Sequence, residues 1–145
     1  MTATEYVIEA LGGSSVFKGR TIPTSSELRE RIKQGLPYRS LESVRERLRL
    51  SVPEAASVLH MPPRTLARRR QARKLDADES DRLYRLARVA AQAVTVLGTE
   101  DKAATWLRRP NRALNGEVPV WLLDTDVGAR QVEDILGRIE HGVVG

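Results

Sequence analysis

The sequence predicts an all-α protein. Aromatic residues make up only 4 % of its 145 residues, hydrophobic residues make up 41 %, and alanine, leucine and arginine are abundant, which favours helices over strands. Apolar side chains recur every three or four positions in several segments, as they do in helices with one buried face. A chain of this length suits one compact domain or two small domains that share a core.

A loosely ordered arm is expected at the N-terminus. Residues 1–24 contain three glycines and Pro23 around short apolar pieces, and residues 1–10 carry two glutamates and no long apolar run. This start resembles neither a signal peptide nor a membrane-spanning helix. Because the chain has no cysteine, it offers no disulfide, thiolate metal site or cysteine nucleophile, and a cytoplasmic location is expected.

Two short amphipathic helices are expected after the arm. Ser25 or Ser26 can cap the first, which runs through Lys33 and stops at Gly35. Ser40 can cap the second, in which apolar residues again recur at helical spacing.

A helix-turn-helix is predicted between residues 51 and 74. In the motif Ser51-x-x-Glu54, the serine oxygen can accept the backbone N–H of Glu54, while the glutamate reaches back to the serine N–H. Residues 60–62 form the turn, and Pro63 suits the first position of the second helix. Two helices joined by so short a turn are what this DNA-binding motif needs.

The second helix of this pair carries the clearest functional signal. Residues 62–74, PPRTLARRRQARK, hold six basic side chains and no acidic one, which is the composition of a surface that meets phosphate. The alternative is a solvated basic face, but the helix-turn-helix context favours DNA binding.

The helical period divides these basic residues into two groups. Arg64 and Arg68 share one face, Thr65 and Arg69 lie one step around it, and these four are expected in the major groove. Arg73 and the remaining basic residues are expected to contact phosphates. For each arginine taken alone, a phosphate contact or simple solvation stays the alternative to base reading.

One long helix is predicted from Asp76 to Leu97, with Glu79 in its first turn and Gly98 as its stop. Its apolar stripe is wide enough to bury on two sides, so the helix is expected to join the two halves of the molecule as a spine. A dimer seam is the alternative use of the stripe.

Three shorter helices are predicted in the C-terminal third. Thr99 caps the first, which Pro110 closes, and Pro119 starts the second after an Asn-Gly turn. Thr125 caps the last, which Gly142 ends. Both tryptophans fall in this third, and the simplest expectation places them in its core.

The predicted organisation has three parts. These are an N-terminal arm and first helix over residues 1–35, a helix-turn-helix region with its long connecting helix over 36–98, and a C-terminal domain over 99–145. Residues 99–145 hold six Lys or Arg and eight Asp or Glu, a net charge of about −2, which leaves about +7 for residues 1–98. The basic part is expected to face nucleic acid and the acidic part another partner.

Catalysis is not indicated. The two histidines, His60 in a turn and His141 near the end, do not form a pair for acid–base work, and the sequence has no metal-ligand spacing and no phosphate-binding glycine loop. No catalytic residue, metal ligand or cofactor is assigned, and the protein is expected not to be an enzyme.

A family resemblance covers about residues 40–145. The segments RTLARRR and KLDADESDRLYRLARV resemble an Xre-type helix-turn-helix, and residues 104–145 resemble the toxin-binding domain of the Xre/MbcA/ParS antitoxins. The most specific parts of the second match are Trp106-Leu107 followed by Pro110-Asn111, the turn from Leu114 to Gly116, Leu123-Asp124-Thr125 with Gly128-Ala129, and Val132 to Gly142.

The resemblance implies a type II antitoxin encoded beside a RES-domain toxin that consumes NAD, with the C-terminal end of the antitoxin covering the toxin's active site. Toxin contacts are expected in two regions. The first contains Trp106, Pro110 and Asn111; the second is the chain end with Arg138, Glu140, His141, Gly142, Val143 and Val144. A frayed terminus is the alternative for the last five residues.

Operator DNA is the other expected partner, and a homodimer is expected because regulators of this kind pair to read two half-sites. The competing hypothesis is a stand-alone helix-turn-helix regulator whose C-terminal domain serves dimerisation or senses a small ligand.

Overall fold

The computed structural model describes residues 1–17 and 22–142. These residues form helices joined by turns and contain no strand, which confirms the all-α class. The α-helices are α1 (Ala3–Leu11), α2 (Ser14–Phe17), α3 (Ser25–Gln34), α4 (Tyr38–Arg47), α5 (Val52–Val58), α6 (Pro63–Ala72), α7 (Ala77–Leu97), α8 (Glu100–Arg108) and α9 (Asp126–Glu140), and the 3-10 helices are η1 (Arg112–Leu114) and η2 (Pro119–Asp124).

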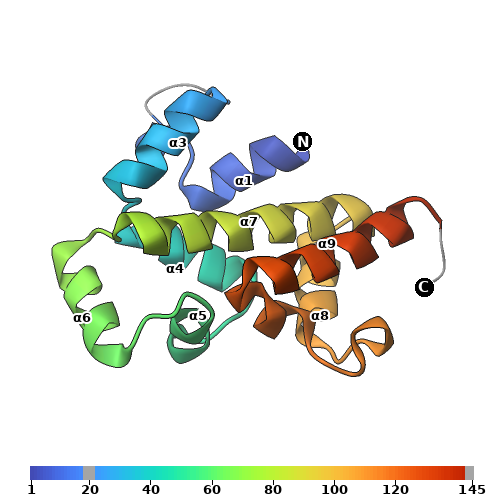
Figure 1. Ribbon diagram of the computed structural model, residues 1–145. Coiled ribbons are helices and arrows are strands. Elements are labelled where there is room, and N and C mark those ends of the chain that lie inside the picture. The colour runs from blue at the N-terminus through green and yellow to red at the C-terminus, as the bar shows by residue number, and fades with distance from the viewer. Residues whose placement is uncertain (18–21, 143–145) are drawn as a thin grey trace.

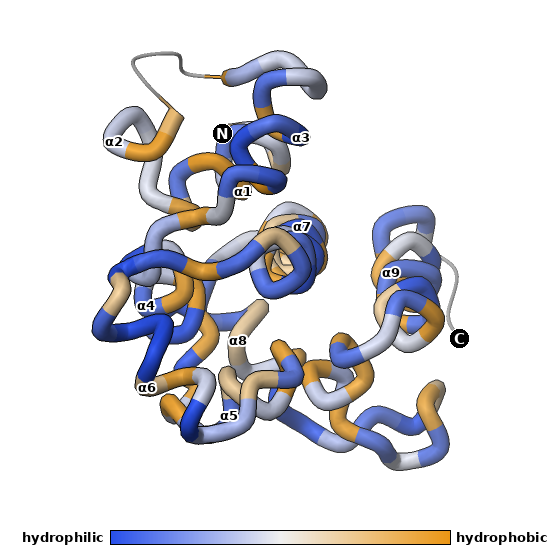
Figure 2. The backbone as a smooth tube through the Cα atoms, turned by 60° about the vertical axis from the view of Figure 1, so that its left-hand side comes forward, coloured by the Kyte–Doolittle hydropathy of each residue, from blue (hydrophilic) through white to orange (hydrophobic). Residues whose placement is uncertain are grey.

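Helix α7 is the spine of the molecule, as predicted. Asp76 caps it in a reciprocal capping box with Glu79, and Gly98, in the left-handed region at φ +98°, ends it. Helices α1, α3, α4, α8 and α9 all contact α7, and Figure 2, which looks almost along this helix, shows several of them around it. The buried stripe of α7 is therefore core rather than a free seam.

The N-terminal arm is a wrong prediction. Thr2 caps α1, and α1 packs on α7 and α4 with an apolar face that includes Ile8 and Leu11, both buried. Gly12 and Gly13 take positive φ angles at the turn into α2. The glycines therefore mark a turn between two packed helices, and the apolar pieces around them belong to the core.

Two predicted helix starts also differ from the structure. Thr24, rather than Ser25 or Ser26, caps α3, because Thr24 and Glu27 form a capping box. Helix α4 begins three residues after Gly35, at Tyr38, and Ser40 is buried inside it, where its hydroxyl donates to the carbonyl oxygen of Leu11 at 2.5 Å. This tertiary partner takes the hydroxyl away from a capping role.

The helix-turn-helix forms as predicted. The backbone N–H of Glu54 donates to Ser51 Oγ at 3.2 Å, and a carboxylate oxygen of Glu54 accepts the N–H of Ser51 at 2.8 Å. His60 turns the chain with φ +56°, and Pro63 is the first residue of α6.

The C-terminal third begins its helices where predicted, with Thr99 capping α8 and Thr125 capping α9. The expectation that both tryptophans are core is wrong for Trp121, which is 38 % exposed. Its segment is the 3-10 helix η2, so Val120 and Leu123, three residues apart, share the buried face and Trp121 points outward.

The last helix buries one apolar stripe less completely than the sequence suggests. Val132, Ile135 and Leu136 are buried, whereas Ile139, one turn further on, is 40 % exposed. Gly128 is required near the start of α9, because a Cβ there would collide with the carbonyl oxygen of Leu122.

Candidate functional site

The outer face of α6 is strongly basic, since this helix carries four arginines and no acidic residue. Arg64 and Arg68 are exposed, and neither side chain makes a hydrogen bond or ion pair with another residue that the structure describes. Thr65 and Leu66 are half-buried, and Leu66 packs against the core as the inward anchor that the sequence predicts. Figure 1 shows α6 at one end of the molecule, beside the start of α7, and Figure 2 shows it as a mostly hydrophilic edge.

Arg69 does not lie with the other predicted groove residues. Its Nε donates to Glu79 Oε1 at 2.7 Å and its Nη2 donates to Asp76 Oδ2 at 3.0 Å. Hydrogen bonding to Glu79 raises the pKa of Arg69. The first turn of α7 therefore holds this guanidinium in the free protein, and the expectation that Arg69 reaches the groove beside Arg68 stays a prediction.

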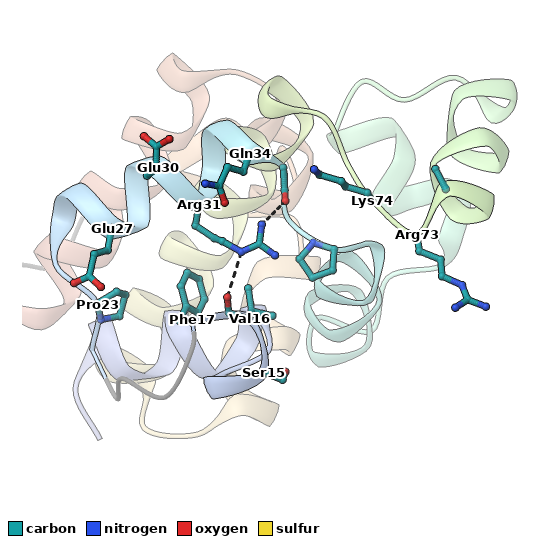
Figure 3. Close-up of a pocket in the computed structure, with 13 residues that line it drawn as sticks. Ser15, Val16, Phe17, Pro23, Glu27, Glu30, Arg31, Gln34, Arg73 and Lys74 are labelled. Carbon is teal, nitrogen blue, oxygen red and sulfur yellow. Dashed lines mark hydrogen bonds between the residues drawn. The ribbon is translucent and has the colours of Figure 1, made fainter.

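A pocket of about 780 Å³ lies beside the C-terminal end of α6, between α2 and α3. Figure 3 shows Arg31 crossing it, with hydrogen bonds to the carbonyl oxygens of Val16 at 3.2 Å and Gly35 at 2.6 Å. Arg73 points away from the pocket and its guanidinium has no partner among the described residues, which leaves its charge available for phosphate.

The helix-turn-helix is bonded directly to the C-terminal third. His60 Nε2 lies 2.6 Å from the carbonyl oxygen of Asp124, and Arg108 reaches a carboxylate oxygen of Glu54 at 3.5 Å. Arg82 of α7 donates to the carbonyl oxygen of Leu59 at 3.2 Å. These contacts join the basic end and the C-terminal third into one body.

A second surface brings three predicted site residues together. Trp106, Pro110 and Asn111 line a groove of about 630 Å³ between the end of α7, the outer side of α8 and η1. Asn111 also shapes the local turn, since its Oδ1 accepts the N–H of Ala113 at 2.9 Å. The sequence pattern did not reveal that Lys102, Arg109 and Arg112 would line the same groove.

The other predicted contacts lie on α9 and just beyond it. Arg138, Glu140, His141 and Gly142 are exposed, and His141 Nε2 lies 3.8 Å from a carboxylate oxygen of Glu140. The predicted contacts Val143 and Val144 lie outside the described residues.

Two features are absent from residues 1–17 and 22–142. There, no group of three or more histidine, cysteine, aspartate or glutamate side chains could hold a metal ion. No helix in those parts is long and apolar enough to cross a membrane.

Two family models match consecutive parts of the chain. Residues 27–88 match the antitoxin Xre-like helix-turn-helix domain, and residues 90–142 match the antitoxin Xre/MbcA/ParS C-terminal toxin-binding domain. The chain is 36 % identical over 126 residues to the antitoxin Xre of Photorhabdus laumondii, covering 84 % of this chain and 85 % of the relative.

The chain belongs to the Xre family of antitoxins. The antitoxin Xre of Yersinia enterocolitica is 37 % identical to it over 77 % of each protein, and that of Pseudomonas putida is 37 % identical over 80 % of this chain and 72 % of the relative. In three dimensions it resembles a chain from the crystal structure of the M. tuberculosis MbcT-MbcA toxin–antitoxin complex. The TM-score is 0.53 at 27 % identity, over 72 % of this chain and 94 % of that one.

The family match confirms the resemblance, and it assigns parts of α7 to both matched regions of this Xre-family antitoxin. The two matched regions meet between residues 88 and 90, inside α7. The spine therefore contributes to both, and the predicted boundaries at residues 35 and 98 stay predictions.

Proposed function

We propose that this antitoxin neutralises a RES-domain toxin that degrades NAD, covering the toxin's active site with residues 99–145, and that it binds operator DNA through α6 to repress its own operon. Its toxin partner follows from family membership; the kind of toxin, the mode of inhibition and the operator are parts of the proposal. The protein acts as a binding partner rather than as an enzyme, in the cytoplasm where operator DNA lies.

The observation that carries the proposal is the separation of the two candidate surfaces along α7. Helix α6 lies beside the N-terminal end of α7, whereas the end of α9 lies toward its other end (Figure 1). A helix of 21 residues is about 30 Å long. Toxin bound at one end leaves α6 open to DNA at the other.

DNA binding rests on the charge and freedom of α6. Arg64 and Arg68 have no partner in the described structure, so their guanidinium groups can pair with base edges without breaking an existing bond. Thr65 lies beside them, and Arg73 supplies a phosphate contact at the end of the helix. We leave Arg69 out of the base-reading set because Glu79 and Asp76 hold it.

A homodimer is part of the proposal. A single helix-turn-helix covers one half-site, and pairing lets two recognition helices meet the major groove about one helical turn apart. Sedimentation of the purified toxin complex checks this, because a monomeric antitoxin bound one-to-one to a monomeric toxin contradicts it.

The neighbouring gene provides the test of function. Its product is co-expressed with and without this antitoxin, and growth, cellular NAD and co-purification are measured. The proposal expects growth arrest and NAD loss with the neighbouring product alone, and recovery of both with the antitoxin. If the neighbouring product leaves NAD unchanged, the proposal that the partner degrades NAD is wrong. A gel shift on the operon's promoter tests the DNA-binding part of the proposal separately.

A further inference from the structure

The groove at the end of α8 has an apolar floor. Leu97 from the end of α7, Trp106 from α8 and Pro110 from the following turn line it, and its volume is about 630 Å³. Leu97 and Trp106 are only partly buried, so solvent reaches apolar surface here. Pockets of this size are large enough to enclose a small ligand or a few side chains of a partner.

The rim of the groove is positively charged. Lys102, Arg109 and Arg112 are exposed, and none of their side chains makes a hydrogen bond or ion pair with another described residue. The acidic residue of the lining, Asp101, is paired with Arg49 of the helix-turn-helix region. The local charge is thus opposite to the net negative charge of residues 99–145.

We propose that this groove binds a short acidic segment of the toxin that inserts an apolar side chain between flanking carboxylates. The floor requires an apolar group, and the three free cations require anions, so this segment complements both features. The inference rests on the proposed function for the toxin as partner, and it names the chemistry of the segment recognised.

The place of the groove favours the toxin over operator DNA as the occupant. The whole groove lies within residues 90–142, which match the toxin-binding domain. Its cations Lys102, Arg109 and Arg112 would also attract DNA, so charge alone does not identify the occupant. Its cations surround an apolar floor, whereas Arg64 and Arg68 stand exposed on the outer face of α6. An apolar floor inside a charged rim is the anatomy of a protein interface.

The first experiment follows Trp106 directly. A Trp121→Phe variant leaves Trp106 as the one tryptophan of the chain, and labelling with 5-fluorotryptophan gives it a single ¹⁹F resonance. Adding the unlabelled product of the neighbouring gene is expected to shift this resonance and to protect it from solvent-induced shifts in D₂O. A resonance that stays unchanged while the toxin is bound overturns the proposal.

The second experiment tests the charge. Reversing Arg109 and Arg112 together to glutamate is expected to weaken toxin binding at least about 10-fold and to flatten its dependence on salt. Arg29→Glu on the exposed side of α3 is the control, because Arg29 also has no partner in the described structure. Equal affinity of the double variant and the control overturns the proposal.

These measurements separate this inference from the proposed function. If the wild-type antitoxin does not bind the neighbouring product, the proposed function fails. If the wild type and the groove variants bind it with equal affinity, only this inference fails. A Trp106 shift that appears on concentrating the antitoxin by itself identifies a second copy as the occupant. A Trp106 shift caused by promoter DNA identifies nucleic acid as the occupant of the groove. Either result overturns the proposal that a toxin segment binds there.

Discussion

Arg69 Nε donates to Oε1 of Glu79 at 2.7 Å, and the carboxylate that receives this bond is almost fully buried at the start of α7. The same oxygen accepts the backbone N–H of Asp76 at 2.9 Å in the capping box. One arginine of the most basic helix is thus bonded to the first turn of the spine, and this contact fixes how α6 sits against α7.

Replacing Arg69 by alanine is expected to destabilise the fold by about 2 kcal/mol, because it leaves the buried carboxylate of Glu79 without its cationic partner. Arg68→Ala, which removes an exposed and unpaired side chain from the same helix, is expected to cost less than about 0.5 kcal/mol. Urea unfolding of both variants measures the difference. Equal stabilities contradict a structural role for the Arg69–Glu79 pair.

The double variant Arg64→Ala plus Arg68→Ala is expected to bind the promoter of its operon about 2 to 4 kcal/mol more weakly. Both side chains are exposed and unpaired, so the fold should keep its stability. The dependence of affinity on salt should also flatten, because fewer counterions are released.

A gel shift over a range of salt concentrations measures this effect, and toxin neutralisation by the same variant is the control. Neutralisation should stay intact because the altered helix lies at the other end of α7. If the promoter affinity is unchanged, the assignment of α6 as the DNA-binding helix is wrong.

Deleting residues 141–145 is expected to abolish neutralisation and leave the fold in place. The buried residues Val132 and Leu136, which anchor α9 on the core, are untouched by this deletion. Arg138→Ala and Glu140→Ala, at the expected rim of the contact, should each weaken toxin binding by about 1 kcal/mol.

Growth and NAD levels of cells that co-express the truncated antitoxin with the neighbouring toxin provide the readout, and circular dichroism checks the fold. Normal growth with normal NAD means that the tail is dispensable. Binding would then rest on the groove with Trp106 and Asn111.

Tyr6 is expected to make stability depend on alkaline pH. Burial raises the pKa of Tyr6, and so does the hydrogen bond that its hydroxyl donates to Glu100 Oε2 at 2.7 Å. Together they bring it to about 12 from an ordinary value of 10.0. Between these two values the folded protein holds a proton that the unfolded chain has released. The free energy of unfolding should therefore be unaffected by Tyr6 below pH 10 and fall as the pH rises toward 12.

The measurement is urea unfolding at pH 9 and at pH 11, together with tyrosinate absorbance. In Tyr6→Phe the part of the alkaline loss that comes from Tyr6 should disappear, and so should the tyrosine titration step near pH 12. An identical alkaline loss in both proteins shows that Tyr6 is not its source.

The sequence by itself determined the helical class, the helix-turn-helix and the limits of the spine. These features depend on interactions between residues close in the chain. The Ser51–Glu54 and Asp76–Glu79 capping boxes, Pro63 at the start of α6 and Gly98 at the end of α7 each act within one turn of helix. Such local rules can be recognised without knowing where the rest of the chain lies.

Only the tertiary structure decided which polar side chains are free. Ser40 donates to Leu11, 29 residues away, Arg69 is bonded to Glu79, and Asp101 pairs with Arg49. The N-terminal segment, predicted as an arm, packs as α1 because α7 and α4 provide it with an apolar surface. A helical pattern specifies which residues share a face, whereas the partner that covers the face is set by packing between elements distant in sequence.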